Sequence, residues 1–282
     1  MSILIADSGG TKTDWVLIGS KSVHKEFSGP GLNPNSTTAE HLDKAIKEVA
    51  DFFKGVDEIH FYGAGCSTAE NSEMLKAKLQ QYFGEAKIQV LSDIISVGRA
   101  LLGRGTGIVG ILGTGSNSAL FKDGAFVSSR PSYGYLLGDE GSGSTIGKLF
   151  LKAFLEEDFS PELQALLSKE IKITEEELVN RLYKTGERPT DFFGSFVKVL
   201  HPHKDDYSEI QALLINAFRD YFKRFINIYK AKSATKSLYL IGSVAHYFKK
   251  EIGEVAKEEG YTIEKVLQKP MPGLIAYHQG LS

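Results

Sequence analysis

The sequence twice opens with the same arrangement, two short apolar runs on either side of a glycine-rich turn. Near the N-terminus, the run 3–6 leads into the turn 7–13, and a second apolar run, 15–18, follows at once. The arrangement starts again at 108–112, which leads into a turn at 113–116 and another apolar run. Strands separated by so few residues must pair as hairpins. Because further strands and helices follow each hairpin in a similar order, the sequence predicts two α/β halves related by a duplication of topology.

A stretch rich in glycine, 103–107, separates the two halves and is the predicted hinge. We expect an N-terminal domain over 1–106 and a C-terminal domain over 107–269, which carries a helical insertion. A last helix within 270–282 is expected to pack back on the first domain. With 282 residues, the chain is long enough for two domains of ordinary size, each with its own core.

Composition narrows the range of partners. The formal net charge is -2, which gives no basic field for nucleic acid or for an anionic membrane surface. No uninterrupted apolar stretch of the sequence approaches the roughly 20 residues that span a bilayer, and the N-terminus lacks the pattern of a signal peptide. The one cysteine, Cys66, allows no internal disulfide. We therefore expect a cytoplasmic protein that binds neither nucleic acid nor membrane.

Both glycine-rich turns have the composition of a phosphate-binding site. Backbone N–H groups in such a turn are unobstructed by side chains, and the concavity they form suits phosphate oxygens. The first turn carries Gly9 and Gly10, and the second carries Gly113 and Gly115. One such turn is weak evidence, because hairpins need glycine anyway, whereas two at matching positions could hold a triphosphate from both sides. Neither turn has the spacing of a P-loop or of the dinucleotide-binding G-x-G-x-x-G motif.

Four segments, in their order and spacing, carry a resemblance over nearly the whole chain. The turn 7–14 is similar to the first phosphate motif of the actin, Hsp70 and sugar-kinase ATPase superfamily, and 113–117 to the second. The segment 241–245 resembles the adenosine motif, and 133–142 resembles a sugar-site segment of N-acetylglucosamine kinases. The resemblance implies an α/β fold of two ribonuclease H-like, actin-like ATPase domains. Each domain would be a mixed sheet with flanking helices, around an interdomain cleft.

Asp93 is the expected catalytic residue. It lies just after the predicted strand 88–91, and α/β sheets bind ligands at the carboxyl ends of their strands. It also matches the catalytic aspartate of these kinases, so the resemblance implies a general base that takes the proton of the attacking sugar hydroxyl. The alternative role for Asp93 is that of a helix N-cap, for which aspartate is favoured.

The resemblance further implies ATP and Mg²⁺ as cofactors and an amino sugar as substrate, most directly N-acetylglucosamine converted to N-acetylglucosamine 6-phosphate. Asp7 is expected to hold Mg²⁺ through water, and its alternative role is that of a turn former. The implied nucleotide-binding residues are Gly9, Gly10, Thr11, Lys12, Gly113, Thr114, Gly242, Ser243 and Ala245. The implied sugar-binding residues are Asn33, Asp93, Ser116, Asn117, Tyr133, Gly134 and Asp139.

Several of these residues also have ordinary structural explanations. Asn33 could be a turn residue before a proline, Asp139 a helix cap, and Lys12 a solvated hairpin residue. Tyr133 stands where the family often has tryptophan, although its ring can still stack on a sugar face. The His-Pro-His run 201–203 is interpreted as a surface loop, because one turn with proline rarely supplies metal-ligand geometry.

Two relatives within the superfamily are the competing interpretations. An ATPase activator of a CoA-ester dehydratase or reductase shares the nucleotide motifs, but it holds an iron–sulfur cluster with more cysteines than Cys66 alone. An actin-like filament protein would have no use for the segment 133–142. The sequence leaves open whether the sugar is N-acetylglucosamine, N-acetylmuramic acid, N-acetylmannosamine or glucosamine. A homodimer is the candidate assembly, since the helical region 150–231 offers a surface for it.

Overall fold

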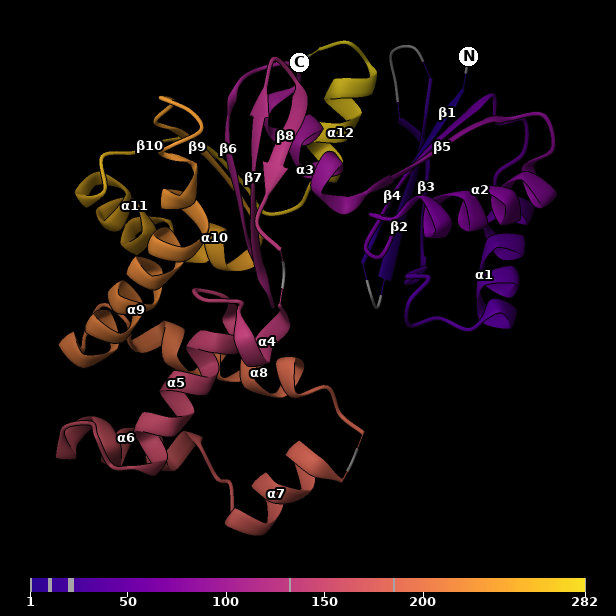
Figure 1. Ribbon diagram of the computed structural model, residues 1–282. Helices are drawn as coiled ribbons and strands as arrows, with labels where there is room; N and C mark the ends of the chain where they lie inside the picture. The colour runs from indigo at the N-terminus through magenta and orange to yellow at the C-terminus, as the bar shows by residue number, and fades with distance from the viewer. Residues whose placement is uncertain (1, 10–11, 20–22, 132, 185, 282) are drawn as a thin grey trace. The chain divides into compact units, whose positions relative to one another are not determined.

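The computed structural model describes residues 2–9, 12–19, 23–131, 133–184 and 186–281. The chain divides into two units (Figure 1). Unit 1 comprises 1–105, 123–126 and 270–282, and unit 2 comprises 106–122 and 127–269. The chain first passes from one unit to the other between Gly105 and Thr106, inside the glycine-rich stretch.

Unit 1 contains a mixed five-stranded sheet. Its strands are β1 (Ile3–Ser8), β2 (Lys12–Ile18), β3 (Val23–Pro30), β4 (Glu58–Gly63) and β5 (Lys87–Ser92). Their order across the sheet is β3-β2-β1-β4-β5. β2 pairs antiparallel with both β1 and β3, as the predicted hairpin requires. β4 pairs in parallel with β1 and β5, so these three strands present their carboxyl ends at one edge.

Helices cover both faces of this sheet: α1 (Ala39–Phe52), α2 (Ala69–Phe83), α3 (Asp93–Leu102) and α12 (Met271–His278). α1 and α2 share a core with Leu4, Ala6 and Phe61 of the sheet. Because side chains alternate along a strand, Tyr62 points to the other face, where it bonds to side chains of α3 and α12. α12 packs closely on α3 at Gly273, where a Cβ atom would press on the backbone of the neighbouring helix.

The capping-box pattern predicts Thr37 as the N-cap of α1, and this is wrong by one position. Thr38 is the N-cap, and its hydroxyl oxygen accepts a hydrogen bond from the backbone N–H of His41. Thr37 lies in the preceding turn, where its hydroxyl donates to a backbone carbonyl group. The matching prediction for Thr174, as the N-cap of α7 (Glu175–Tyr183), is confirmed.

Unit 2 is built on a second sheet of the same design. Its strands are β6 (Gly107–Leu112), β7 (Ser116–Lys122), β8 (Ala125–Ser129), β9 (Ser237–Ile241) and β10 (Thr262–Leu267). Their order is β10-β9-β6-β7-β8. β6 pairs antiparallel with β7 and in parallel with β9, so it occupies the place that β1 occupies in the first sheet. The predicted duplication of topology is confirmed.

The remaining helices of unit 2 are α4 (Gly134–Leu137), α5 (Gly143–Leu155), α6 (Pro161–Glu170), α8 (Pro189–Leu200), α9 (Ser208–Tyr221), α10 (Ser243–Tyr247) and α11 (Lys249–Glu258). A π-helical turn, Phe222–Ile226, continues α9. Phe150, Phe192 and Phe218 are fully buried in the core that joins α5, α8 and α9. In the part of the chain that the structure describes, no helix is long and apolar enough to cross a bilayer.

Candidate active site

In unit 1 the two acidic candidates lie at the carboxyl ends of the parallel strands. Asp7 is close to the end of β1, and Asp93 directly follows β5. The register aligns Ser8 with Gly63 of β4 and Gly63 with Ser92 of β5, so the three strands end level with one another. Ligands of α/β sheets bind at this kind of edge.

Asp7 and Asp93 form a pair of neighbouring acidic groups, of which Asp7 is partly buried and Asp93 is exposed at the surface. Burial, together with the negative charges of Asp93 and Asp14, raises the pKa of Asp7 to about 7. Desolvation by the surrounding protein also raises the pKa of Asp93, although the backbone N–H of Ile94 opposes the shift by hydrogen bonding to the carboxylate. Acidic groups with raised pKa values are typical of functional sites, where they are suited to bind a proton or a cation.

Asp93 also supports the start of its own helix. α3 begins at Asp93, and Ser92 occupies the N-cap position without a capping hydrogen bond from its side chain. Oδ1 of Asp93 accepts a hydrogen bond from the backbone N–H of Ile94 at 2.9 Å. This bond fixes the direction of the carboxyl group, so the structural and the catalytic interpretations of Asp93 are compatible.

Asn33 lies in the turn between β3 and α1, where Oδ1 accepts a hydrogen bond from the backbone N–H of Asn35 at 2.9 Å. The same oxygen lies against Gly65, where the positive φ of 82° and the close contact exclude a larger residue. The neighbouring Cys66 lies near Asp93, since burial and the charge of Asp93 raise the pKa of its thiol to about 11. Asn33 and Asp93 therefore approach the same turn. The turn role of Asn33 is observed, and its sugar-binding role stays a prediction.

The first glycine-rich turn is described in part, because the predicted ligands Gly10 and Thr11 lie outside the described residues. The backbone N–H of Gly9 donates to the carbonyl of Lys12 at 2.9 Å and closes the turn. The amino group of Lys12 lies 2.7 Å from the carboxylate of Asp14, so it has a protein partner at the surface. The nucleotide-binding roles of Gly9 and Lys12 stay predictions.

The second glycine-rich turn joins β6 to β7 and is fastened to the start of α5. The backbone N–H of Gly143 donates to the carbonyl of Gly113 at 2.8 Å, and that of Ser144 donates to Thr114 at 3.1 Å. These N–H groups belong to the first turn of a helix, which leaves them without partners inside the helix. The turn and the helix therefore stabilise each other.

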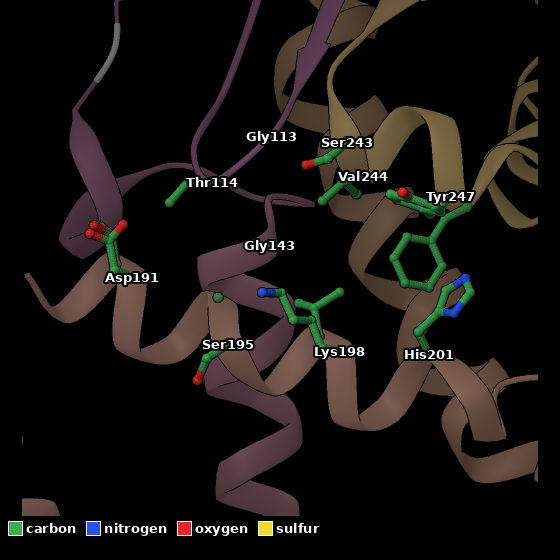
Figure 2. A pocket seen from close by; sticks show the side chains of 14 residues that line it. Gly113, Thr114, Gly143, Asp191, Ser195, Lys198, His201, Ser243, Val244 and Tyr247 are labelled. Carbon is green, nitrogen blue, oxygen red and sulfur yellow. The ribbon is translucent and has the colours of Figure 1, made fainter. Parts of the chain in front are cut away.

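A cavity of about 510 Å³ opens beside this turn, within unit 2. Its walls come from the turn and the start of α5, from α8, and from α10 (Figure 2). The lining residues are Gly113, Thr114, Gly143, Thr190, Asp191, Gly194, Ser195, Val197, Lys198, His201, Ser243, Val244, Tyr247 and Phe248. Such a volume suits a small organic ligand. The cavity brings together Gly113, Thr114 and Ser243 of the predicted nucleotide-binding residues.

Gly242 and Ala245, which belong to the same predicted set, are not among the lining residues. Gly242 has a φ of 119°, and a Cβ atom there would press on the carbonyl of Leu112. Ala245 is fully buried in the core of unit 2. Both residues lie behind the cavity lining. Gly242 allows the chain to turn from β9 into α10 next to the end of β6. Their direct contact with a nucleotide stays a prediction.

α8 and the 3₁₀ turn His201–His203 that follows it supply lining residues that were not predicted from the sequence. Lys198 extends its amino group into the cavity, and His201 lies beside Tyr247 with ring centroids 5.6 Å apart (Figure 2). The surface-loop prediction is therefore wrong for His201, whereas His203 pairs with Glu170 at 3.1 Å. The available signal was the recurrence of small and polar residues along one face of α8: Thr190, Asp191, Gly194, Ser195 and Lys198.

Three of the predicted sugar-binding residues of unit 2 lie together. Oδ1 of Asp139 accepts a hydrogen bond from the backbone N–H of Ser116 at 3.1 Å. The hydroxyl of Ser116 donates to the carbonyl of Glu140 at 2.8 Å, and Asn117 follows Ser116 in β7. Asp139 is 8% exposed, and burial raises its pKa. The N-cap of α5 is Ser142, so the alternative of Asp139 as that cap is wrong.

Tyr133 and Gly134 lie at the start of the short helix α4. Tyr133 occupies its N-cap position with an exposed ring, and Gly134 has a positive φ of 67°. Leu136 and Leu137 are exposed on the same helix. The segment that leads to Asp139 therefore offers aromatic and apolar surface.

Comparison with solved structures identifies the family. The structure matches that of a protein from Porphyromonas gingivalis, provisionally named an N-acetylglucosamine kinase, over 99% of both chains with a TM-score of 0.88 and 33% sequence identity. The chain belongs to the N-acetylglucosamine kinase family. This family is a branch of the actin-like ATPase superfamily, as the four motif segments predict. No family model matches the sequence.

Two further relatives are less similar to this chain. The N-acetylmuramic acid/N-acetylglucosamine kinase of Clostridium acetobutylicum is 27% identical over 196 residues, which are 64% of this chain and 63% of that protein. The chain thus spans under two thirds of that curated relative's length. A ROK family glucokinase from Streptomyces griseus, solved with glucose and AMPPNP, shares the fold with a TM-score of 0.59 over 98% of both chains, at 14% identity.

Proposed function

We propose that the protein is an ATP-dependent kinase that phosphorylates a hydroxyl group of an amino sugar. N-acetylglucosamine, phosphorylated on its 6-hydroxyl group, is the first candidate, because the Porphyromonas gingivalis and Clostridium acetobutylicum relatives carry this sugar in their names. The observation that carries the proposal is the position of Asp93. It is a carboxyl group with a raised pKa at the carboxyl-end edge of a sheet, where ligands of α/β sheets bind, and the sequence resemblance matches it to the catalytic aspartate of these kinases.

In this proposal Asp93 is the general base. A hydroxyl group attacks phosphorus more readily when a positioned base takes its proton, and a base with a raised pKa accepts that proton more readily. The pKa of Asp93 is raised by desolvation, and its bond to Ile94 holds the carboxyl group in place. Phosphoryl transfer otherwise requires mainly positioning and charge stabilisation from the protein.

The nucleotide is proposed to bind in the cavity of unit 2. Val244 and Tyr247 offer apolar and aromatic walls for the base, and Ser243 and Lys198 offer hydrogen-bond donors. The turn that carries Thr114 is held by the start of α5, so it is already ordered for phosphate oxygens.

Asp7 is proposed to hold the Mg²⁺ that accompanies ATP. Its fit rests on a partly buried carboxyl group whose pKa is raised to about 7 by burial and by the charges of Asp93 and Asp14, since a cation would relieve that repulsion. Among the described residues, no group of three or more His, Cys, Asp or Glu is arranged to hold a metal. Mg²⁺ in kinases is typically held by one or two carboxylates together with water and phosphates, so a site with Asp7 as its carboxylate does not require such a group. The bound ion neutralises charge on the transferred phosphoryl group.

Asp139, with Ser116 and Asn117, is proposed to bind the sugar in unit 2, and Asn33 is the corresponding candidate in unit 1. Carboxylate, amide and hydroxyl groups supply the paired donors and acceptors that sugar hydroxyls and an acetamido group require. The hydrogen bond from the backbone N–H of Ser116 to Oδ1 of Asp139 supports this assignment, because it fixes the carboxylate before a ligand arrives.

A panel of sugars tests the proposed function. The protein is incubated with ATP, Mg²⁺ and, in turn, N-acetylglucosamine, N-acetylmuramic acid, N-acetylmannosamine, glucosamine and glucose as the sugar without an amino group. ADP release and the mass of the product are measured. We expect sugar-dependent ADP release and a product heavier by one phosphoryl group with N-acetylglucosamine. ATP turnover that no sugar changes, with no phosphorylated product, would contradict the proposal.

The activator alternative is disfavoured by the state of Cys66. This thiol is buried, and burial together with the charge of Asp93 raises its pKa to about 11. Iron–sulfur clusters are held by several cysteine thiolates, and Cys66 is the one cysteine of the sequence. Iron in the purified protein would reverse this conclusion.

A further inference from the structure

The π-helical turn that follows α9 is fastened to the sheet and to the chain beside it. The carbonyl of Arg224 accepts a hydrogen bond from Nη1 of Arg130 at 2.7 Å, and that of Phe225 accepts one from the hydroxyl of Ser118 in β7 at 2.7 Å. The guanidinium of Arg130 also lies 4.5 Å from the centre of the Phe225 ring. These contacts hold the turn in place. π-helical turns are rare, and they often occur at functional sites.

The turn presents the side chain of Arg224 to Glu140, the residue next to the predicted sugar ligand Asp139. Nε of Arg224 lies 3.2 Å from Oε1 of Glu140. The Arg224 side chain is 51% exposed, but that of Glu140 is only 19% exposed. Oε2 of Glu140 is buried and has no hydrogen-bond partner among the described residues. Arg224 is thus the cationic partner of a carboxylate that is mostly withdrawn from water.

Glu140 sits in a backbone turn that needs external support. Asp139, on one side, has a φ of 60°, which is unusual for a residue other than glycine. Gly141, on the other side, has a φ of 73° and lies against Tyr221 of α9, where a Cβ atom would be 2.7 Å from the tyrosine Cβ. The carbonyl of Glu140 accepts the hydrogen bond from Ser116. A shift of Glu140 would therefore move both Asp139 and Ser116.

We propose that Arg224 is a positioning residue of the sugar site: by holding Glu140, it holds Asp139 and Ser116 in the arrangement that receives the sugar. The proposal rests on the proposed function, in which Asp139 and Ser116 bind the sugar. Arg224 acts on these residues through its ion pair with Glu140, and Tyr221 contacts the same turn from the other side.

The effect of Arg224 is expected to be local. A half-exposed ion pair adds little to the stability of the whole fold. Removing the cation, however, leaves the largely buried carboxylate of Glu140 without its partner, which is unfavourable unless the side chain turns outward. Such a movement pulls on the turn that carries Asp139. We therefore expect lost sugar affinity with little change in melting temperature.

Arg219 provides a matched control on the same helix. Its side chain is 50% exposed and pairs with Glu258, itself 49% exposed. Nε and Nη2 of Arg219 both lie 3.0 Å from that carboxylate. Arg219→Ala therefore removes an arginine of similar exposure from α9, paired with a more exposed carboxylate, without touching Glu140, and it should leave the kinetics unchanged.

The first test compares Arg224→Ala, Arg224→Lys, Glu140→Gln and Arg219→Ala in steady-state kinetics with N-acetylglucosamine and ATP. Arg224→Ala should raise the KM for the sugar about 10-fold, the effect of losing one hydrogen bond to a charged group. The KM for ATP should stay within about twofold, because the nucleotide cavity does not include this turn. Arg224→Lys keeps the charge and should recover part of the loss. Equal sugar KM values for Arg224→Ala and Arg219→Ala overturn the proposal, as do parallel losses in the KM for both substrates.

The second test does not depend on which sugar is used. Hydrogen exchange is followed at the amides of Ser116 and Ser142, which bond to the carboxylate and to the carbonyl of Asp139. In Arg224→Ala these amides should exchange about 10-fold faster than in the unmodified protein, and in Arg219→Ala they should not. Unchanged exchange overturns the positioning role. If the unmodified protein phosphorylates no sugar, the proposed function fails, and the exchange result still decides whether Arg224 orders the turn.

Discussion

The phenol of Tyr62 and the imidazole of His278 are joined by a hydrogen bond of 2.8 Å, although 216 residues separate them in the sequence. Nη1 of Arg99 donates to the same phenol oxygen at 2.7 Å, so the phenol directs its own proton to Nε2 of His278. A neutral imidazole is required for this arrangement. The ring of His60 also lies against that of His278, with centroids 4.2 Å apart. The hydrogen bond between Tyr62 and His278 therefore joins α12 to β4, and Arg99 of α3 bonds to the same phenol. The bond to His278 exists only while its imidazole is uncharged.

Acidification is expected to destabilise unit 1 through His278. Burial, with the positive charges of His60 and Arg99, lowers the pKa of His278 from 6.5 to about 3. Between these two values the unfolded chain binds a proton that the folded chain does not, so the free energy of unfolding falls as the pH falls below 6.5. His278→Gln removes this titration. Its melting temperature should therefore change less between neutral pH and about pH 5 than that of the unmodified protein.

His246, exposed on α10, provides the control for this experiment. His246→Gln should follow the pH dependence of the unmodified protein in scanning calorimetry. If His278→Gln and the unmodified protein lose stability equally on acidification, His278 is not the group that couples α12 to pH.

Asp93 and Asp139 are predicted to affect different steps. Asp93→Asn keeps the shape of the side chain and removes the base, so it should lower kcat by about 10² to 10⁴-fold with a modest change in sugar affinity. Asp139→Asn should act mainly on sugar binding, and its KM for the sugar should rise more than its kcat falls. Steady-state kinetics and calorimetric titration with the sugar separate the two effects. A near-normal kcat for Asp93→Asn would mean that Asp93 only supports the start of α3.

Lys198 is predicted to bind the nucleotide, because its amino group extends into the cavity beside Thr114 and Ser243. Lys198→Met keeps an unbranched side chain and removes the charge. The KM for ATP should rise by about 10-fold, as expected for one lost hydrogen bond from a charged group, while the KM for the sugar stays constant. Lys152→Met, an exposed change on α5, is the control. If the two variants have the same KM for ATP, the nucleotide does not contact Lys198.

Local patterns were sufficient to predict the two hairpins, since the strands of each hairpin are adjacent in sequence, whereas the parallel pairs β1–β4 and β6–β9 join strands that are far apart in the chain. The β1–β2 hairpin and its repeat as β6–β7 follow from short apolar runs around glycine-rich turns. Asp93 could be found because a single strand end determines its place. Lys198 could not be found in this way, because its α8 meets the Gly113 turn only through the packing of α8 on α5. A helix with one polar face looks the same whether that face meets solvent or lines a cavity.

Gly242 is also a position where the structure changes the prediction made from sequence. The resemblance to the adenosine motif predicts that a side chain at this position would fill the adenosine surface, whereas in the structure a Cβ atom would press on the carbonyl of Leu112 at the end of β6. The backbone angles of Gly242, φ 119° and ψ 168°, are also nearly exclusive to glycine. Even Gly242→Ala should therefore lower the free energy of unfolding by about 1–3 kcal/mol.

Because Leu112 leads directly into Gly113, the strain at Gly242 should also displace the turn that is proposed to bind phosphate, and so weaken ATP binding. Gly253→Ala, in the middle of α11 where a Cβ atom meets nothing within 4 Å, should instead leave ATP binding unchanged. It should raise stability by about 0.5–1 kcal/mol, because alanine is the better helix former. Thermal melts with and without ATP compare the two variants. A Gly242→Ala protein that melts and binds ATP like the unmodified protein would show that the junction of β9 and α10 does not shape the nucleotide site.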